Sequence, residues 1–182
     1  MRMSALVAVF AMIVTPGSIA GSPSPYVSAR SQDIKALSHA EVEDLLAGRG
    51  MGYAKAAELN EYPGPAHVLE LADDLQLSAK QRLDTQAIFD RMAASAKTVG
   101  PLLVESERAL DSSFREKYVT PESLARAVEK IAHLQGELRR IHLQAHIEQT
   151  AVLTSNQITQ YAVQRGYTNH SSESAGQDRH HE

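Results

Sequence analysis

Two segments, Leu77-Ser78-Ala79-Lys80-Gln81 and Leu153-Thr154-Ser155-Asn156-Gln157, share one pattern that decides the expected fold. In each, a hydroxyl residue stands three positions before a glutamine, which is the arrangement of a helix capping box. The hydroxyl accepts a hydrogen bond from the backbone amide of the third helical residue, and the glutamine side chain returns to the amide of the cap. The two segments therefore predict helices that begin directly after Ser78 and Thr154.

The other helices begin with related signals. Ser38 stands three positions before Glu41 in a further capping box, and Thr120 precedes Pro121, a residue favoured at the first helical position. No segment alternates between apolar and polar residues as a strand would. The fold class is therefore predicted to be all-α, with these helical segments: 38–59, 66–75, 78–116, 121–151 and 155–165.

The two longest segments are expected to pair as an antiparallel helical hairpin, flanked by the short helices. A kink is expected in the first of them near Gly100-Pro101, because proline removes a backbone donor and clashes with the preceding turn. In the second, an apolar stripe recurs at helical spacing around Leu138. Leu143 and Ile147 lie near the opposite side of that helix. We expect them either to be an exposed apolar surface for clients or to form the seam of a homodimer, which a thin hairpin favours.

The ends of the chain differ from its middle. Residues 1–20 combine Arg2, a short apolar run and a small-residue cleavage pattern that ends at Ala20, which is typical of a secretory signal peptide. An uncleaved anchor is the alternative, but the apolar run is far below the ~20 residues of a spanning helix. We expect cleavage near Ala20, a periplasmic location, and no stable membrane insertion afterwards. The expected divisions are an N-terminal extension with a Gly-interrupted helix (21–65), the hairpin domain (66–167) and a disordered His-containing tail (168–182).

Composition excludes several classes of function. The 182-residue chain has a formal net charge of −4, which argues against a nucleic-acid partner. It has no cysteine, which excludes disulfides, thiolate zinc sites and a cysteine nucleophile. The Gly48-Arg49-Gly50-Met51-Gly52 run lacks the Lys-Ser/Thr of a phosphate loop and indicates instead a turn at which the first segment folds back. No catalytic motif is present, and the chain is not expected to be an enzyme.

The paired motifs give the chain a family resemblance. Leu77, Ser78 and Gln81, together with Leu153, Thr154 and Gln157, resemble the LTxxQ motifs of the Spy/CpxP superfamily over residues 66–167. Ser78 departs from the family form, which has threonine there. The resemblance implies a curved, interlocked helical-hairpin dimer in the periplasm. It also implies one of three roles: ATP-independent chaperone, regulator of envelope-stress signalling, or heavy-metal-responsive protein.

Histidines provide the candidate metal ligands. His142 and His146 stand four residues apart on one helix, so that their rings stack on one face as a metal pair requires. His67 and Glu70, one turn apart on a short helix, are the best candidates to complete the set. The ion would be Zn²⁺, Ni²⁺, Co²⁺ or Cu²⁺. The alternative is that these are solvated or hydrogen-bonded helix histidines, and no cofactor is then required.

Two functions follow from these observations. The first is a periplasmic ATP-independent chaperone or envelope-stress adaptor of the Spy/CpxP type. Its partners would be unfolded or envelope proteins, or a sensor kinase or anti-sigma factor. The alternative is a periplasmic heavy-metal-binding sensor or resistance protein that uses the histidines of the hairpin.

Overall fold

The computed structural model describes residues 24–167, and every regular element in that range is helical, which confirms the all-α fold class. The expected signal peptide (1–20) and the expected tail (168–182) lie outside the described residues. No helix between residues 24 and 167 combines the length and apolar character that crossing a membrane needs. The elements in chain order are a 3₁₀ turn at Ser28–Ser31, α1 (His39–Ala47), α2 (Lys55–Glu58), α3 (Pro65–Glu70), α4 (Ala79–Arg115), α5 (Pro121–Val152) and α6 (Ser155–Gln164).

The helix starts are those that the capping signals predict. Ser38, Ser78, Thr120 and Thr154 each accept a hydrogen bond from the amide three residues on, and each box is closed by the returning side chain. At Thr120 the returning side chain is Ser123, a partner that the sequence reading did not single out. These bonds satisfy amides that the helix itself leaves without partners.

Two predicted helices are shorter in the structure. The segment 38–59 is divided into α1 and α2, because Gly48 closes α1 in the left-handed conformation with φ 69°. The segment 66–75 is helical only over α3 and continues as turns. There Gln76 takes φ 50° and Leu77 donates to the carbonyl of Ala72, which returns the chain to the cap of α4.

The two motif glutamines join the start of α4 to the junction of α5 and α6. Nε2 of Gln81 donates to the carbonyl of Val152 at 3.0 Å and to Oε1 of Gln157 at 2.8 Å. Nε2 of Gln157 in turn donates to the carbonyl of Leu75 at 3.1 Å. We call these bonds the amide clasp. Each motif therefore caps its own helix and also holds the other motif.

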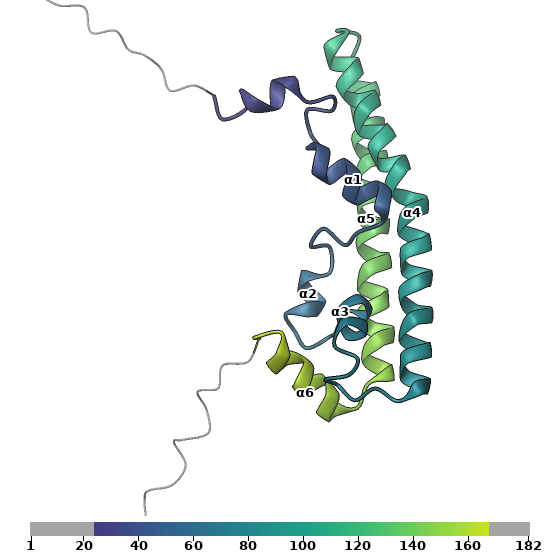
Figure 1. Ribbon diagram of the computed structural model, residues 1–182. Coiled ribbons are helices and arrows are strands. Elements are labelled where there is room, and N and C mark those ends of the chain that lie inside the picture. Colours follow the sequence, from purple (N-terminus) through teal and green to yellow (C-terminus); the bar gives the residue numbers. More distant parts are fainter. Residues whose placement is uncertain (1–23, 168–182) are drawn as a thin grey trace, which may run out of the picture.

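The hairpin of α4 and α5 carries the main core. The two helices lie side by side along the molecule (Figure 1), and α4 runs through Pro101 as one helix whose two halves are inclined to each other. The expected stripe on α5 is buried, which confirms the predicted core face. The buried apolar residues of this core are Ile34, Leu45, Ala96, Leu103, Val104, Ile131, Leu134, Leu138 and Ile141.

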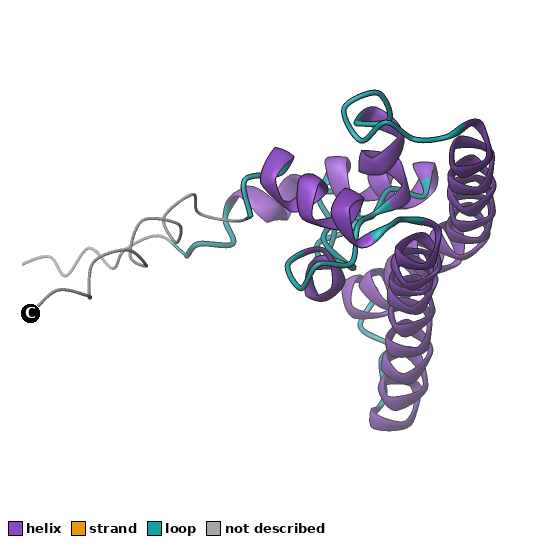
Figure 2. Cartoon of the chain, turned by 90° about the horizontal axis from the view of Figure 1, so that it is seen from below, coloured by secondary structure: helices purple, strands orange, loops and turns teal. Residues whose placement is uncertain are grey.

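The N-terminal segment belongs to the same core. The short helices gather on one side of the hairpin in both Figure 1 and Figure 2, and α1 packs against α4. The two helices approach closely at Gly100, where an added Cβ would lie 2.0 Å from the carbonyl oxygen of Leu45. Gly100 is therefore required for the contact between α1 and α4.

The short helices also change the surface of α5. They bury a second sector of this helix, on which His142 and His146 lie. Leu143 is half-buried instead of exposed as expected, because it lies beside that covered sector. Ile147 is 54% exposed, as a surface position for clients or a dimer seam would require.

Candidate functional site

A pocket of about 330 Å³ lies between the hairpin and the short helices. It is the place where three of the four expected metal ligands come together. His142 and His146 line it from α5, and His67 lines it from α3. The remaining lining residues are Gly50, Met51, Gly52, Ala54, Lys55, Glu58, Gly64, Pro65, Ala66 and Met92. We call this space the histidine pocket.

His142 has an unsatisfied nitrogen. The side chain is 3% exposed, and the ring of Tyr53 stacks on it with centroids 6.0 Å apart and planes 8° from parallel. Burial, with a smaller contribution from the charge of His146, lowers the pKa of His142 below its usual 6.5. The imidazole is therefore neutral at pH 7. Its Nε2 is buried and has no hydrogen-bond partner among the described residues.

His146 is oriented by the backbone. Its Nδ1 lies 2.7 Å from the carbonyl oxygen of Tyr62, so Nδ1 must carry the proton and donate. In the neutral ring, Nε2 then keeps its lone pair. A Cβ at Gly64 would lie 3.0 Å from this nitrogen, so that only glycine leaves the space next to it open. A ring N–H held by a backbone carbonyl is the usual support of a histidine that ligates a metal through its other nitrogen.

Glu58 is the residue of this site that the sequence reading missed. It lies at the end of α2, and Oε1 accepts hydrogen bonds from the hydroxyls of Tyr161 and Tyr167. Its carboxylate also lies 3.3 Å from Nδ1 of His67 and 3.6 Å from Nδ1 of His146.

These contacts decide the charge of Glu58. Burial alone would raise its pKa. The hydroxyl hydrogen bonds and the two neighbouring imidazoles outweigh burial and hold the pKa below its usual 4.5. Glu58 is therefore an ionised carboxylate between two histidines, and its Oε2 has no hydrogen-bond partner in residues 24–167. Nothing in the local sequence of α2 distinguishes it from other glutamates.

The remaining expected ligands are placed differently. His67 reaches the pocket, but its Nε2 lies 3.4 Å from a guanidinium nitrogen of Arg165. Glu70 is exposed on α3 and does not line the pocket. Within residues 24–167, no group of three or more His, Asp or Glu side chains is arranged to hold a metal ion. The pocket therefore brings donors together without placing them in a coordination geometry.

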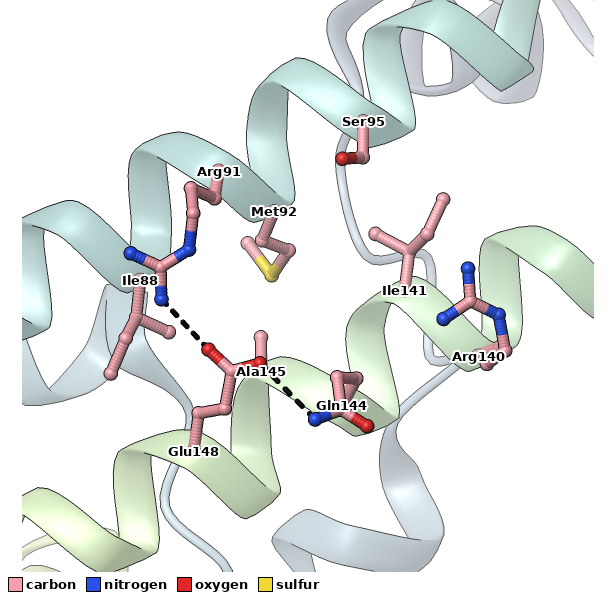
Figure 3. Close-up of a pocket in the computed structure, with 9 residues that line it drawn as sticks. All are labelled: Ile88, Arg91, Met92, Ser95, Arg140, Ile141, Gln144, Ala145 and Glu148. Atoms are coloured by element: carbon pink, nitrogen blue, oxygen red, sulfur yellow. Dashed lines mark hydrogen bonds and ion pairs between the residues drawn. The ribbon is translucent and has the colours of Figure 1, made fainter.

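A second cavity, of about 210 Å³, opens between α4 and α5 (Figure 3). Arg91 reaches across from α4 to Glu148 at 2.8 Å, and Gln144 donates to the same carboxylate at 3.1 Å. Met92 projects between the two helices (Figure 3) and lines both cavities. Because the charged groups of this groove are already paired, it offers less for binding than the histidine pocket.

Comparison with known proteins identifies no relative of this chain. No family model, curated protein or solved structure matches the chain. The geometry of the histidine pocket is therefore the main ground for assigning a function.

Proposed function

We propose that this protein binds a transition-metal ion in the histidine pocket and acts as a metal-responsive sensor or resistance protein outside the cytoplasm. The observation that carries the proposal is the buried Nε2 of His142, a neutral imidazole nitrogen without a partner, in a pocket shared with two further histidines. Neutral imidazole is the ligand form that Zn²⁺, Ni²⁺, Co²⁺ and Cu²⁺ accept.

The two histidines of α5 would hold the ion through Nε2. Nε2 of His142 has no hydrogen-bond partner in residues 24–167, Nδ1 of His146 donates to the Tyr62 carbonyl and leaves its Nε2 for a ligand, and the space at Gly64 leaves that nitrogen accessible. A third ligand would come from His67 or Glu58, after their mutual contact of 3.3 Å opens. A bound metal ion would supply positive charge next to the Glu58 carboxylate.

Such binding would change how the short helices sit on the hairpin. Glu58 is on α2 and His67 is on α3, whereas His142 and His146 are on α5. A ligand set drawn from both layers would exchange a carboxylate–imidazole contact for metal bonds across the pocket. The metal-free and metal-bound states would then differ in how α2 and α3 contact α5, and a sensor needs two such states.

The test is calorimetric titration of the purified protein with Zn²⁺, Ni²⁺, Co²⁺ and Cu²⁺. The background has His170, His180 and His181 replaced by alanine, so that histidines outside the described residues do not contribute. We expect one saturable site and a rise in unfolding temperature on binding. The double variant His142→Ala/His146→Ala should abolish it, whereas the exposed His133→Ala on α5 serves as the matched control.

Gly64→Ala is a second variant for the same test. It adds one methyl group next to Nε2 of His146 and leaves every candidate ligand in place, since glycine here has an ordinary backbone conformation. We expect weaker metal binding with an intact helical spectrum. If the double histidine variant binds metal as tightly as its parent, the proposed site is wrong.

Exposed apolar side chains favour a second candidate, a chaperone or stress adaptor of the Spy/CpxP type. Leu83 is 71% exposed on α4, and Ile147 is exposed on α5. Reversible capture of unfolded envelope proteins by a homodimer would use such side chains, and a sensor kinase or anti-sigma factor could dock there as well. Single exposed apolar residues are common on protein surfaces, so we place the metal-binding function ahead of the chaperone function.

The chaperone candidate has its own measurement. The protein should suppress aggregation of a denatured client without ATP, and Ile147→Ser should reduce the effect while His142→Ala leaves it unchanged. Absence of suppression at several-fold molar excess would count against this candidate.

A further inference from the structure

Two methionines from different segments of the chain line the histidine pocket. Met92 comes from α4, in the hairpin, and Met51 comes from the turn between α1 and α2. No other methionine lies within residues 24–167, and the chain has no cysteine. Both thioethers in this part of the molecule therefore line the cavity that also contains three imidazoles.

The backbone at Met51 is unusual for its residue type. Its φ is 44°, in the left-handed region, between Gly50 and Gly52. Glycine or asparagine would occupy this conformation at lower cost, since a long side chain there is disfavoured by about 1 kcal/mol or more. Met51 is also 37% exposed, so that burial in a core does not explain it. The turn therefore keeps a methionine at the pocket in a position that would favour glycine.

The donor set has a definite chemical preference. Thioether sulfur is a soft ligand that selects Cu(I), whereas carboxylate oxygen suits harder ions. Glu58 is the one carboxylate that lines the pocket; its Oε1 accepts hydrogen bonds from two tyrosines and lies 3.6 Å from Nε of Arg165, while its Oε2 has no hydrogen-bond partner in residues 24–167. The other donors of the pocket are the Nε2 atoms of His142 and His146 and the two sulfur atoms, and the sulfur atoms are the soft ligands among them.

We propose that the histidine pocket selects Cu(I), with Met51 and Met92 as the ligands that give the selectivity. This inference rests on the proposed metal-binding function and names its ion. A monovalent cation next to the Glu58 carboxylate brings less charge into the pocket than a divalent ion would. Binding would fix the 48–52 turn to the hairpin, because Met51 and Met92 belong to different layers.

The probe is Cu(I) under anaerobic conditions, in competition with the chromogenic chelator bicinchoninate. The protein carries the three tail histidine substitutions described above. Met51→Leu and Met92→Leu keep the approximate size and the apolar character of the side chains and remove the sulfur. We expect each to weaken Cu(I) binding about tenfold or more, with little change in Zn²⁺ affinity. His133→Ala should change neither, and X-ray absorption should show Cu–S scattering that both leucine variants reduce.

A second variant separates folding from binding. Met51→Gly removes the side chain and its backbone strain together, so the unfolding temperature should hold or rise while Cu(I) affinity falls. If Zn²⁺ binds as tightly as Cu(I) and the leucine variants bind Cu(I) like their parent, selectivity by sulfur is refuted and the metal site stands. If neither ion binds, the proposed function and this inference both fall.

Discussion

Gly100→Ala tests whether the close contact between α1 and α4 holds the N-terminal segment on the hairpin. Alanine in a helix interior is favoured over glycine by about 0.5–1 kcal/mol. At this position the new methyl carbon would lie 2.0 Å from the carbonyl oxygen of Leu45. Real Cβ atoms essentially never approach another heavy atom within 3.0 Å. The α1 backbone must therefore retreat by about 1 Å, the difference between these two distances.

The retreat carries a calculable cost. Leu45 is among the most deeply buried side chains of the main core, and full burial of a leucine is worth about 1.5–3 kcal/mol. Overpacking of a well-filled interior typically costs about 1–3 kcal/mol. After subtraction of the helical gain, Gly100→Ala should lower the free energy of unfolding by about 1–2 kcal/mol.

Gly136 provides the matched control. It also lies inside a long helix, and nothing stands within 4 Å of the position that its Cβ would take. Gly136→Ala should therefore raise the free energy of unfolding by about 0.5–1 kcal/mol. The assay is urea unfolding followed by circular dichroism at the helical band. If Gly100→Ala is as stable as Gly136→Ala, the contact of α1 with α4 does not hold this segment in place.

Three further changes have defined outcomes. Burial raises the pKa of Glu107 above its usual 4.5, so the carboxyl group stays protonated to a higher pH in the folded protein than in the unfolded chain. The folded state therefore loses stability as the pH rises above 4.5. Glu107→Gln should raise the urea midpoint at about pH 7 and have little effect on it near pH 4. Gln157→Ala removes the bond to the Leu75 carbonyl and half of the amide clasp, and should cost about 1–2 kcal/mol in the same assay, whereas no loss would make the clasp incidental. Tyr161→Phe removes one hydroxyl from the buried Glu58 carboxylate and should cost about 1.5–3 kcal/mol, with the helical spectrum as the check on folding.

The helix starts could be predicted because their causes are local. Ser78 and Thr154 bond to amides three residues away, so a five-residue segment contains both partners. The buried stripe around Leu138 was predictable for a similar reason, since it follows from helical spacing alone. The sequence could not show that the two motif glutamines also hold each other, because they are 76 residues apart.

The candidate site was predictable only in part. His142 and His146 share a helix face because of their spacing, and His67 lines the same pocket, as expected. Glu58 could not be foreseen, because its position depends on how α2 folds back and on tyrosines more than a hundred residues away. Glu70 has the right residue type and spacing, yet it faces outward because Pro65 and Val68 are the buried residues of α3.

The amide clasp also bears on how the chain reaches its folded state. Contacts between α4 and α5 can form from the connecting turn outward, each one closing only a slightly longer loop than the last. The clasp closes the longest of these loops, and the entropy of closure grows slowly with length, by about 0.6 kcal/mol for each doubling. The turn end of the hairpin should therefore be structured earliest, and the clasped end, with α6 and the pocket beside it, should be the part that forms last and opens first.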